Sequence, residues 1–525
     1  MQLMPLDLLY IGPISLLLRG MSGLVGLFQS FKLIAQANVD TNEPGGVQPR
    51  FLIVLPVLRE QVVFGRMIEH FLRFVTNSNY VQIIIVTAAI ESIGRQNSLL
   101  RADDLVESLS KGMSKERLCL KFRGVLPRPA LLSLYDSTAA LPREAIGDLV
   151  AEAFTQWPET QDLVNQFIDA HSEEVANVIS HYTYPESDAT MARQINYAVQ
   201  QELQYRSRSD LEKRLTYVTI YNADSQPSLH TLKSVIGLIK SHSTDVDCWP
   251  QVIQQSALFA GNIAGFAKSP QGYVLRGLSL LQTRWTLTRE IPRLIRQSRI
   301  YSFSMRHSPL WYRQLFLSPL GHCVGHGLFI RLDLFEGMGG VPTSTVNEDL
   351  PLGYCFSARR IPIYPLPCLE IADSPDSIIE TILQKKRWFW SYLQYPMCRD
   401  LAEYLDLGDA NSRLSLLLQG LFQGLAWLMT SPCILATLLL VFIRPDVLTI
   451  LLVVTAISLY YILPFWLILT SRLLPLRGTV VESACCILGG IIAYLTDSIG
   501  PWLCCFEGLI AKITRTMPIS GKTER

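Results

Sequence analysis

Residues 51–58, FLIVLPVL, and residues 81–86, VQIIIV, decide the fold of this chain. Both are short, continuous apolar runs rich in β-branched residues, which is typical of strands buried on both faces of a parallel sheet. Residues 60–75 between them have helical spacing, so the three segments predict a βαβ unit. We therefore expect a doubly wound, Rossmann-like α/β core.

Further strands are expected along the chain from the same kind of apolar run. Residues 215–221, LTYVTIY, end at the polar pair Asn222 and Asp224, and shorter runs follow at 325–330 and 361–366. In an open parallel sheet, ligands bind beyond the carboxyl ends of the strands, so this polar pair is well placed for binding. Residues from about 95 to 180 have helical periodicity and many charges, which indicates a helical insertion.

The composition indicates that part of the chain lies in lipid. Hydrophobic residues are 49% of the 525, charged ones only 17%, and the mean hydropathy is +0.24. Residues 414–443 and 447–471 contain no charge, and each exceeds the roughly 20 residues that a helix needs to cross hydrocarbon. With residues 478–496 and 502–511 they predict about four membrane helices within 411–511, the last two being short enough to form a re-entrant hairpin instead.

The two ends of the chain suggest its orientation. Residues 1–36 form two apolar segments around Arg19, which predicts a membrane span or an interfacial helix that is not cleaved off. After a linker at 37–50, the domain to residue 410 is expected in the cytoplasm, because Arg472, Arg477 and the basic tail 512–525 mark the cytoplasmic side. The sequence thus predicts an integral membrane protein.

Several function classes lack their expected features. A net charge of +1 gives no field to attract nucleic acid, so we expect no nucleic-acid partner. The 11 cysteines include no C-x-x-C spacing and are interpreted as packing residues. No Walker A or H-E-x-x-H sequence is present, which argues against ATP-driven transport and zinc-dependent hydrolysis.

Four polar clusters could carry chemistry, and each also has a purely structural explanation. Asn222 and Asp224 could hold a divalent cation that bridges two phosphates, or form a turn that closes a strand. Glu348 and Asp349 could act as a general base, or simply be acids at a helix N-terminus.

The other two clusters are a helix with Arg and Trp and a helix with Asn. Gln384, Arg387 and Trp388 lie on an amphipathic segment, about 376–395, that could neutralise a diphosphate and stack on a sugar, or form an interfacial belt. Asn196 lies on a helix that precedes the strand at 215–221, where it could bond a base or ribose, or act in capping or in the core.

Taken together, these motifs resemble those of membrane-integrated family 2 glycosyltransferases, similar to cellulose and hyaluronan synthases. The resemblance covers roughly residues 51–400 and the helices that follow. It implies a GT-A catalytic fold in which Asn222-Ala-Asp224 matches a D-x-D metal motif and Glu348-Asp349 an E-D pair, with Asp349 as the base. Gln384, Arg387 and Trp388 match a Q-x-x-R-W motif.

The resemblance also assigns ligands to residues. It implies a Mg²⁺ or Mn²⁺ ion at Asp224, a nucleotide-sugar donor, UDP-linked in the first place, and a diphosphate bound by Asn222, Asp224, Arg387 and Gln384. Trp388, with Gly327 and His326 from a loosely similar loop, is implied to bind the acceptor.

The sequence departs from the family pattern at two places. Asn222 is neutral where the motif has an acid, and Glu91 is the one acid near the end of the second strand, where the family has an acidic pair. Glu91 and Asn196 are therefore the candidates for binding the base and ribose.

The leading hypothesis is an inverting glycosyltransferase that works on a growing polysaccharide or a lipid-linked glycan at the inner face of a bacterial inner or plasma membrane. A catalytically silent subunit of a polysaccharide assembly complex is the alternative, and partner subunits are expected in either case. A transporter without enzymatic activity is a third hypothesis, which leaves the long α/β segment without a task.

Overall fold

The computed structural model describes residues 9–38, 47–75, 80–92, 102–122, 125–138, 141–175, 178–307, 319–474, 476 and 479–514. The chain divides into two compact units. The first combines residues 1–47, 225–330 and 344–521, and the second combines 48–224, 331–343 and 522–525. Most of the expected linker, Arg477 and nearly all of the expected basic tail lie outside the described residues.

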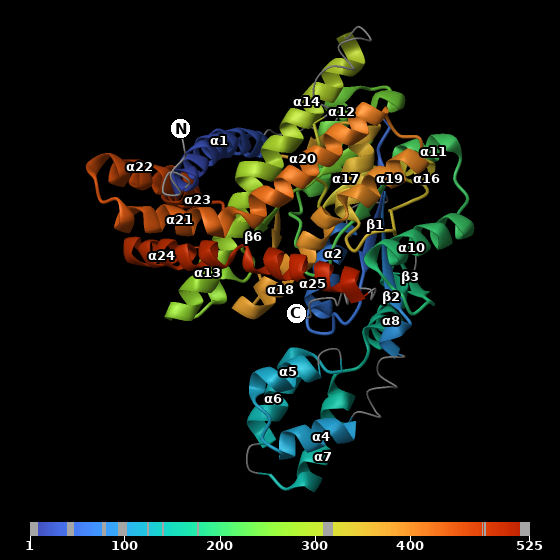
Figure 1. The fold of residues 1–525 in the computed structure, drawn as a ribbon. Helices are drawn as coiled ribbons and strands as arrows, with labels where there is room; N and C mark the ends of the chain where they lie inside the picture. The colour runs from blue at the N-terminus through green and yellow to red at the C-terminus, as the bar shows by residue number, and fades with distance from the viewer. Residues whose placement is uncertain are drawn as a thin grey trace. The chain divides into compact units, whose positions relative to one another are not determined.

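The second unit contains the expected parallel α/β core (Figure 1). Its strands lie in the order β3-β2-β1-β4, and all three neighbouring pairs are parallel. The predicted βαβ unit is present. The elements are β1 (Arg50–Pro56), α2 (Phe64–Val75), β2 (Val81–Ala88), β3 (Ile179–Tyr184) and β4 (Thr216–Ile220). Strands β2 and β4 are buried along their whole length, which explains their continuous apolar sequence.

Strand β3 was not expected from its sequence, ISHYTY. It lies at the edge of this group of strands, so its central residues are only partly buried and can be polar. Its polar side chains pair with β2, where Thr87 Oγ1 lies 2.9 Å from His181 Nε2 and 3.1 Å from Thr183 Oγ1. An edge strand held by such contacts lacks the apolar signal that marks its neighbours.

The helices of the second unit fall into two groups. Six short helices occupy residues 102–175, and α4 to α7 enclose a hydrophobic core of their own. Their bounds are α4 (Ala102–Ser110), α5 (Lys115–Lys121), α6 (Arg128–Thr138), α7 (Arg143–Gln156), α8 (Thr160–Ala170) and α9 (Ser172–Val175). The others are α10 (Met191–Tyr205), α11 (Asp210–Leu215) and α16 (Leu332–Gly337).

The first unit contains short strands with mixed pairing. Strand β5 (Val252–Gln254) pairs antiparallel with β7 (Leu328–Arg331) and parallel with β8 (Ile363–Pro365). A second pair is formed by β6 (Ala257–Phe259) and β9 (Glu370–Ala372). The expected strands at 325–330 and 361–366 are thus present but shorter, and the chain is confirmed as a mixed α/β protein.

Helices make up the rest of the first unit. Those outside the apolar carboxyl-terminal region are α1 (Ile11–Ile34), α12 (Thr231–His242), α13 (Pro270–Trp285), the π-helix η5 (Thr286–Glu290), α14 (Ile291–His307), α17 (Asp349–Ala358), α18 (Ile378–Leu393) and α19 (Tyr395–Tyr404). After them come α20 (Ala410–Leu428), α21 (Thr430–Ile443), α22 (Val447–Ile457), the π-helix η6 (Ser458–Ile462), α23 (Leu463–Thr470), α24 (Val480–Thr496) and α25 (Ile499–Thr514).

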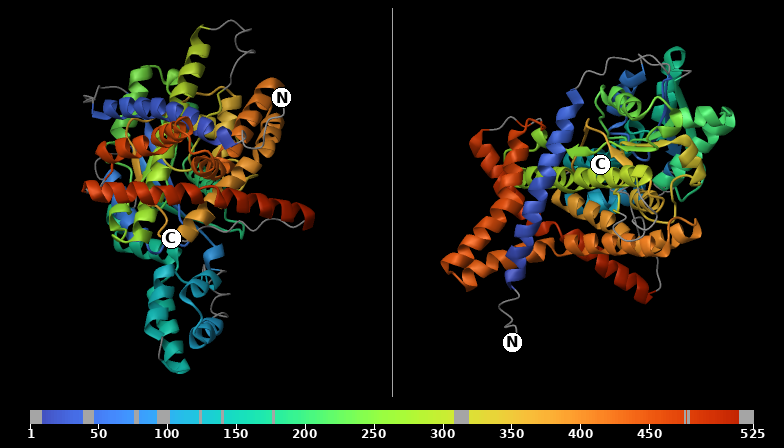
Figure 2. Two further views of the ribbon diagram at one scale, coloured as in Figure 1. Left: turned by 60° about the vertical axis from the view of Figure 1, so that its left-hand side comes forward. Right: turned by 90° about the horizontal axis from the view of Figure 1, so that it is seen from above.

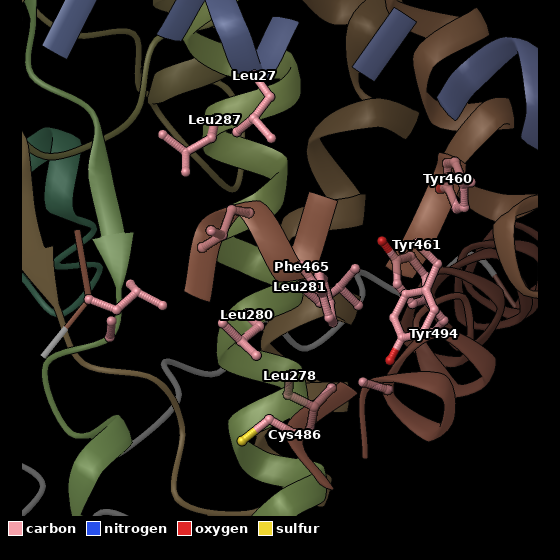
Figure 3. Close-up of a cluster of buried hydrophobic side chains, with 14 of the residues drawn as sticks. Leu27, Leu278, Leu280, Leu281, Leu287, Tyr460, Tyr461, Phe465, Cys486 and Tyr494 are labelled. Atoms are coloured by element: carbon pink, nitrogen blue, oxygen red, sulfur yellow. The ribbon is translucent and has the colours of Figure 1, made fainter. Parts of the chain in front are cut away.

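The amino-terminal helix packs among the carboxyl-terminal ones. Helix α1 lies beside α21, α22 and η6, and α13 lies along α24 (Figures 1 and 2). Together they bury an apolar core to which Leu27, Leu281, Phe465 and Tyr494 belong (Figure 3). Between helices that lie in lipid, close van der Waals packing of such side chains stabilises the arrangement.

Within the part of the chain that the structure describes, three helices are long and apolar enough to cross a membrane. They are Ile11–Ile34, Val447–Thr470 and Val480–Ile510, and the bent pair Ala410–Leu428 and Thr430–Ile443, with 45° between its halves, would make a fourth if it forms one span. The expected span at the amino terminus is among them. The separate spans expected at 478–496 and 502–511 are instead parts of one 31-residue candidate.

Candidate functional site

Two adjacent carboxylates begin α17. Glu348 occupies the N-cap position, and Asp349 Oδ1 accepts a hydrogen bond of 2.8 Å from the backbone N–H of Leu350. Burial, with the charge of Asp349, raises the pKa of Glu348 to about 7. Burial also raises the pKa of Asp349, although the hydrogen bond from Leu350 and the charges of His326 and Arg387 oppose that change. One proton can thus stay on the pair near neutral pH.

Asn347 fixes the acidic pair beside α18. Its Nδ2 donates to the carbonyl oxygen of Arg387 at 3.1 Å and to Ser391 Oγ at 2.5 Å. One residue earlier, the backbone N–H of Val346 donates to Gln394 Oε1 at 2.9 Å. The start of α17 is therefore anchored on the helix that bears the predicted Q-x-x-R-W motif.

The loop before β7 lies against the same carboxylates. A Cβ atom on Gly325 would lie 2.7 Å from Glu348 Oε1, so a larger residue at this position would displace the carboxylate of Glu348. Gln254, on β5, holds the loop: its Nε2 donates to the carbonyl oxygen of His326 at 2.8 Å, and its Oε1 accepts from the backbone N–H of Val324 at 2.9 Å. Gly327 has φ +63°, a conformation that glycine adopts without strain.

His326 is paired with a buried carboxylate. Its Nδ1 lies 3.1 Å from Glu370 Oε2, and the Glu370 side chain is fully buried. Burial alone would lower the pKa of His326, but the charge and hydrogen bond of Glu370 outweigh it and raise the pKa above its ordinary value. Glu370 Oε1 has no hydrogen-bond partner within the described part of the chain.

An aromatic contact joins His326 to Trp388. The Phe259 ring lies between them, with its centroid 6.4 Å from the His326 ring at 90° and 6.0 Å from the Trp388 ring at 57°. Trp388 is half-buried. The residues predicted to bind an acceptor, Trp388, Gly327 and His326, therefore belong to one local cluster in the first unit.

Helix α18 is held in place by its other residues. Gln384 Oε1 accepts a hydrogen bond of 2.9 Å from Gln282 Nε2 on α13, so its side chain faces the protein. Lys385 forms a buried ion pair with Asp497 at 2.6 Å, and Lys386 pairs with Glu507 at 2.7 Å. Arg387 is half-buried and is close enough to Glu348 and Asp349 to lower the pKa of both.

The predicted metal residues lie in the second unit, just after β4. Asp224 is 5% exposed and Asn222 is half-buried. Within the described ranges, no group of three or more His, Cys, Asp or Glu side chains is arranged to hold a metal ion. An ion at Asp224 would need other ligands, and Mg²⁺ commonly takes them from water and substrate phosphates.

Glu91 serves as a junction between loops of the second unit. Its Oε1 accepts hydrogen bonds from Gln61 Nε2 and from the backbone N–H and hydroxyl of Thr160, at 2.8 to 2.9 Å. Its Oε2 accepts from the backbone N–H of Arg59 at 3.0 Å. The carboxylate thus ties the segment after β1 to the start of α8.

Asn196 borders a cavity of about 490 Å³ between α10 and residues 335–340. Its Nδ2 donates to the carbonyl oxygen of Val341 at 2.8 Å, and its Oδ1 accepts from the backbone N–H of the same residue at 2.7 Å. A Cβ atom on Gly340 would collide with the Asn196 side chain. Gly340 therefore allows this close approach.

The structure brings part of the predicted site together within one unit. Glu348, Asp349, Arg387, Trp388, Gly327 and His326 are linked by the contacts above, and Gln384 supports their helix. Asn222, Asp224, Glu91 and Asn196 belong to the second unit, each with its own local contacts.

Sequence reasoning missed four residues that organise this site: Gln254, Phe259, Asn347 and Glu370. The sequence does mark Glu370, because it is the single charged residue within the apolar stretch 366–372. Asn347 directly precedes the acidic pair, and its position was the only signal.

Comparison with known proteins gives little further information. No protein-family model and no curated protein sequence matches the chain. Among solved structures, the chain is similar to the mannosyltransferase PcManGT from Pyrobaculum calidifontis in complex with GDP-Man and Mn²⁺, with a TM-score of 0.41 and 11% identity over 96% of this chain and 99% of that one. A similarity this low carries no weight for activity, so function rests on the site residues.

Proposed function

We propose that the chain is an inverting glycosyltransferase with a GT-A-like catalytic domain on the cytoplasmic side of a membrane. It would move a sugar from a nucleotide-diphosphate donor to a hydroxyl of a growing polysaccharide or a lipid-linked glycan. The observation that carries this proposal is the contact of the acidic pair Glu348 and Asp349 with the loop at 325–327 and with α18. A base, a cation and an aromatic platform are the groups that glycosyl transfer needs.

Asp349 is proposed as the general base. A carboxylate beside the acceptor can remove the hydroxyl proton as the oxygen attacks the anomeric carbon, and a pKa raised toward neutrality strengthens such a base. Glu348 and Asp349 share a proton near pH 7, so that the pair carries one negative charge rather than two until that proton is lost and Asp349 is fully available as the base.

Arg387 and the aromatic cluster would hold the two substrates. The guanidinium of Arg387 is suited to stabilising the negative charge of the departing diphosphate. Trp388 offers a flat apolar face to a sugar ring, with His326 and Gly327 beside it on the acceptor side. Gln384 contributes by fixing α18 against α13.

Donor binding is proposed for the residues of the second unit. Asp224, with Asn222, would hold Mg²⁺ or Mn²⁺ through the donor diphosphate, which supplies the oxygen ligands that the protein lacks. The ion would neutralise phosphate charge. Glu91 and Asn196 are the candidates for the base and ribose of a UDP-sugar or a GDP-sugar.

The test is transfer by the purified full-length chain with a panel of UDP- and GDP-sugars. Asp349→Asn should reduce nucleotide release by about 100- to 10,000-fold, which is the usual contribution of a general base, while leaving donor binding intact. Asp400→Asn, the same change at a residue whose side chain is 71% exposed on α19, is the matched control. Equal activity of the Asp349 variant and the control would refute the assignment.

A catalytically silent subunit of a polysaccharide assembly complex is the second candidate. Two observations favour it: Asn222 is neutral, and the carboxylate of Glu91 is used by four hydrogen bonds within the protein. Such a subunit would release no nucleotide from any donor under conditions in which it remains folded, whereas the enzyme would.

A further inference from the structure

Three arginines meet inside the helical region of the first unit. Arg19 lies on the candidate membrane span α1, Arg284 near the end of α13, and Arg289 on the π-helix η5. Tyr460, on the π-helix η6, is their common neighbour: the guanidinium carbons of Arg19 and Arg284 lie 5.2 and 4.4 Å from its ring centroid.

Glycines on α1 allow the close approach that forms this cluster. A Cβ atom on Gly20 would lie 2.7 Å from the backbone nitrogen of Tyr460, and one on Gly26 would lie 2.6 Å from the carbonyl oxygen of Thr288. Small residues have this role at the interfaces of membrane helices. The backbone of α1 thus rests directly on both π-helices, which are local departures that often occur at functional sites.

Most N–H donors of the three arginines have no hydrogen-bond partner among the described residues. Arg284 donates to the carbonyl oxygen of Tyr460 at 2.7 Å, Arg19 to Thr430 Oγ1 at 3.0 Å, and Arg289 to the carbonyl oxygen of Arg19 at 3.2 Å and Ser22 Oγ at 3.5 Å. Arg284 is 5% exposed, and its Nε has no partner in the described structure.

Among the described residues this arrangement has no carboxylate partner of its own: the charge of Asp497 reaches Tyr460, but Asp497 is paired with Lys385. None of the three arginines forms an ion pair with a carboxylate of the described residues. Burial, together with the charges of Arg284 and Arg293, lowers the pKa of Arg289 to about 10, so it still carries its proton at neutral pH. Three like charges gathered in an apolar region are unfavourable unless an anion joins them.

The surface beside the cluster is apolar. Ile14, Leu18, Met21, Val25 and Phe28 are 46 to 59% exposed and repeat at helical spacing along α1. Arg19 and Arg289 are themselves half-buried, so the cluster opens next to this stripe while Arg284 closes its inner end. A ligand that fits both features has an anionic head and an apolar chain.

We propose that Arg19, Arg284 and Arg289 bind the phosphate of a membrane lipid whose apolar chain lies along the exposed stripe of α1. Arginine is suited to this task because its planar guanidinium binds phosphate oxygens in pairs. The Tyr460 ring would keep two guanidinium groups oriented toward the ligand through cation–π contacts. The proposal does not depend on the proposed glycosyltransferase activity.

Native mass spectrometry of the delipidated full-length chain in a zwitterionic detergent tests this directly. Phosphatidylglycerol should bind at a concentration at which phosphatidylcholine does not, because the choline head adds a positive charge next to the arginines. Arg289→Gln should weaken phosphatidylglycerol binding by about tenfold, as expected for the loss of one charge-assisted contact. Arg444→Gln, which removes an arginine placed over the Tyr10 ring at a centroid distance of 5.7 Å, is the matched control and should bind like the wild type.

Further outcomes separate the proposal from a purely structural role. If the three arginines only join helices, Arg289→Gln will lower the melting temperature without changing the preference for phosphatidylglycerol, which overturns the proposal. Equal binding of the two lipids also overturns it. Inorganic phosphate that displaces the lipid at equal concentration would show a free-anion site instead. Arg19→Gln, on the half-buried side of the cluster, provides a second variant if Arg289→Gln does not fold.

Discussion

Glu348 and Asp349 are neighbours in the chain and in space, so their titration is coupled. We expect kcat/KM to rise with pH around pH 7, as the pair loses its shared proton and the base becomes available. Glu348→Gln removes the adjacent acid and should move this rise to lower pH. A pH–rate profile of both proteins tests the expectation, and identical profiles would contradict it.

Glu290 should make stability depend on pH in the first unit. It is 1% exposed, and burial raises its pKa to about 7 from an ordinary 4.5. The folded state therefore holds this proton more tightly than the unfolded state. The resulting stability, at most about 3 kcal/mol, is present below pH 4.5 and lost as the pH rises to 7.

Glu290→Gln should flatten this dependence, since glutamine keeps the size of the side chain without the titration. Melting temperatures in detergent between pH 5 and pH 8 provide the measurement. Glu69→Gln, at a side chain that is 75% exposed, is the control and should follow the wild type. If the melting temperatures of the wild type and of Glu290→Gln fall equally as the pH rises, Glu290 is not the cause of the pH dependence.

At the residue level, the sequence predicted part of the site and could not reach the rest. The acidic pair and the Arg-Trp pair are recognisable because each lies in a short motif. Glu370 stands out only as a single charge within a short apolar stretch, because its partner His326 is 44 residues away and only folding brings them together. Phe259 is likewise one aromatic among many until its contacts with His326 and Trp388 are known.

Two adjacent lysines of α18 make ion pairs of different burial, which predicts different costs of removal. The Lys385 and Asp497 side chains are 3% and 13% exposed, whereas those of Lys386 and Glu507 are 19% and 43% exposed. Removing one partner of a buried pair typically costs about 3–5 kcal/mol, and exposed pairs contribute about 1 kcal/mol or less. Lys385→Met should therefore lower the melting temperature markedly, and Lys386→Met only slightly.

Thermal unfolding of the two variants, side by side in one detergent, gives the comparison. Each substitution removes one positive charge from the same helix, so net charge and helix propensity are matched. If Lys386→Met lowers the melting temperature more than Lys385→Met does, α18 is held to α25 mainly through Glu507.

At the level of elements, the parallel strands β1, β2 and β4 were predictable because nearly complete burial gives them a continuous apolar sequence, whereas the partly buried edge strand β3 was not. The segment from α13 through η5 to α14 was not predicted. Most of α13 and η5 is buried although Arg276 and Arg284 are among the buried residues, so these helices have no apolar stripe or run that identifies them. A π-helix has no sequence signal of its own, which makes η5 and η6 visible only in the structure.

For the whole molecule, the candidate spans predict firm retention in membranes. We expect the full-length chain to stay in the pellet after an alkaline carbonate wash and to enter solution only with detergent, because the candidate spans are apolar helices of 24 residues or more, long enough to cross the hydrocarbon of a bilayer. Release by carbonate would contradict this expectation. A peripheral protein held by charge is the control for the wash.

The division of the chain into parts depends on packing over long sequence distances. Sequence reasoning separates residues 37–410 from the apolar helices after them, whereas contacts group 225–330 and 344–410 with those helices. The packing of α13 along α24 is one reason, since these helices are far apart in the chain. No local composition change marks such an association.

The long separation between α1 and its neighbours has a consequence for biosynthesis. Arg19 bonds Thr430, which is 411 residues further along the chain, and Tyr10 contacts Thr449. At about 5–20 residues per second, a ribosome needs roughly 20–80 s to make the intervening polypeptide. During that time Gly20 and Arg19 of the nascent amino-terminal segment lack the packing partners that α21 and η6 later supply. We therefore expect insertases or membrane chaperones to bind this segment.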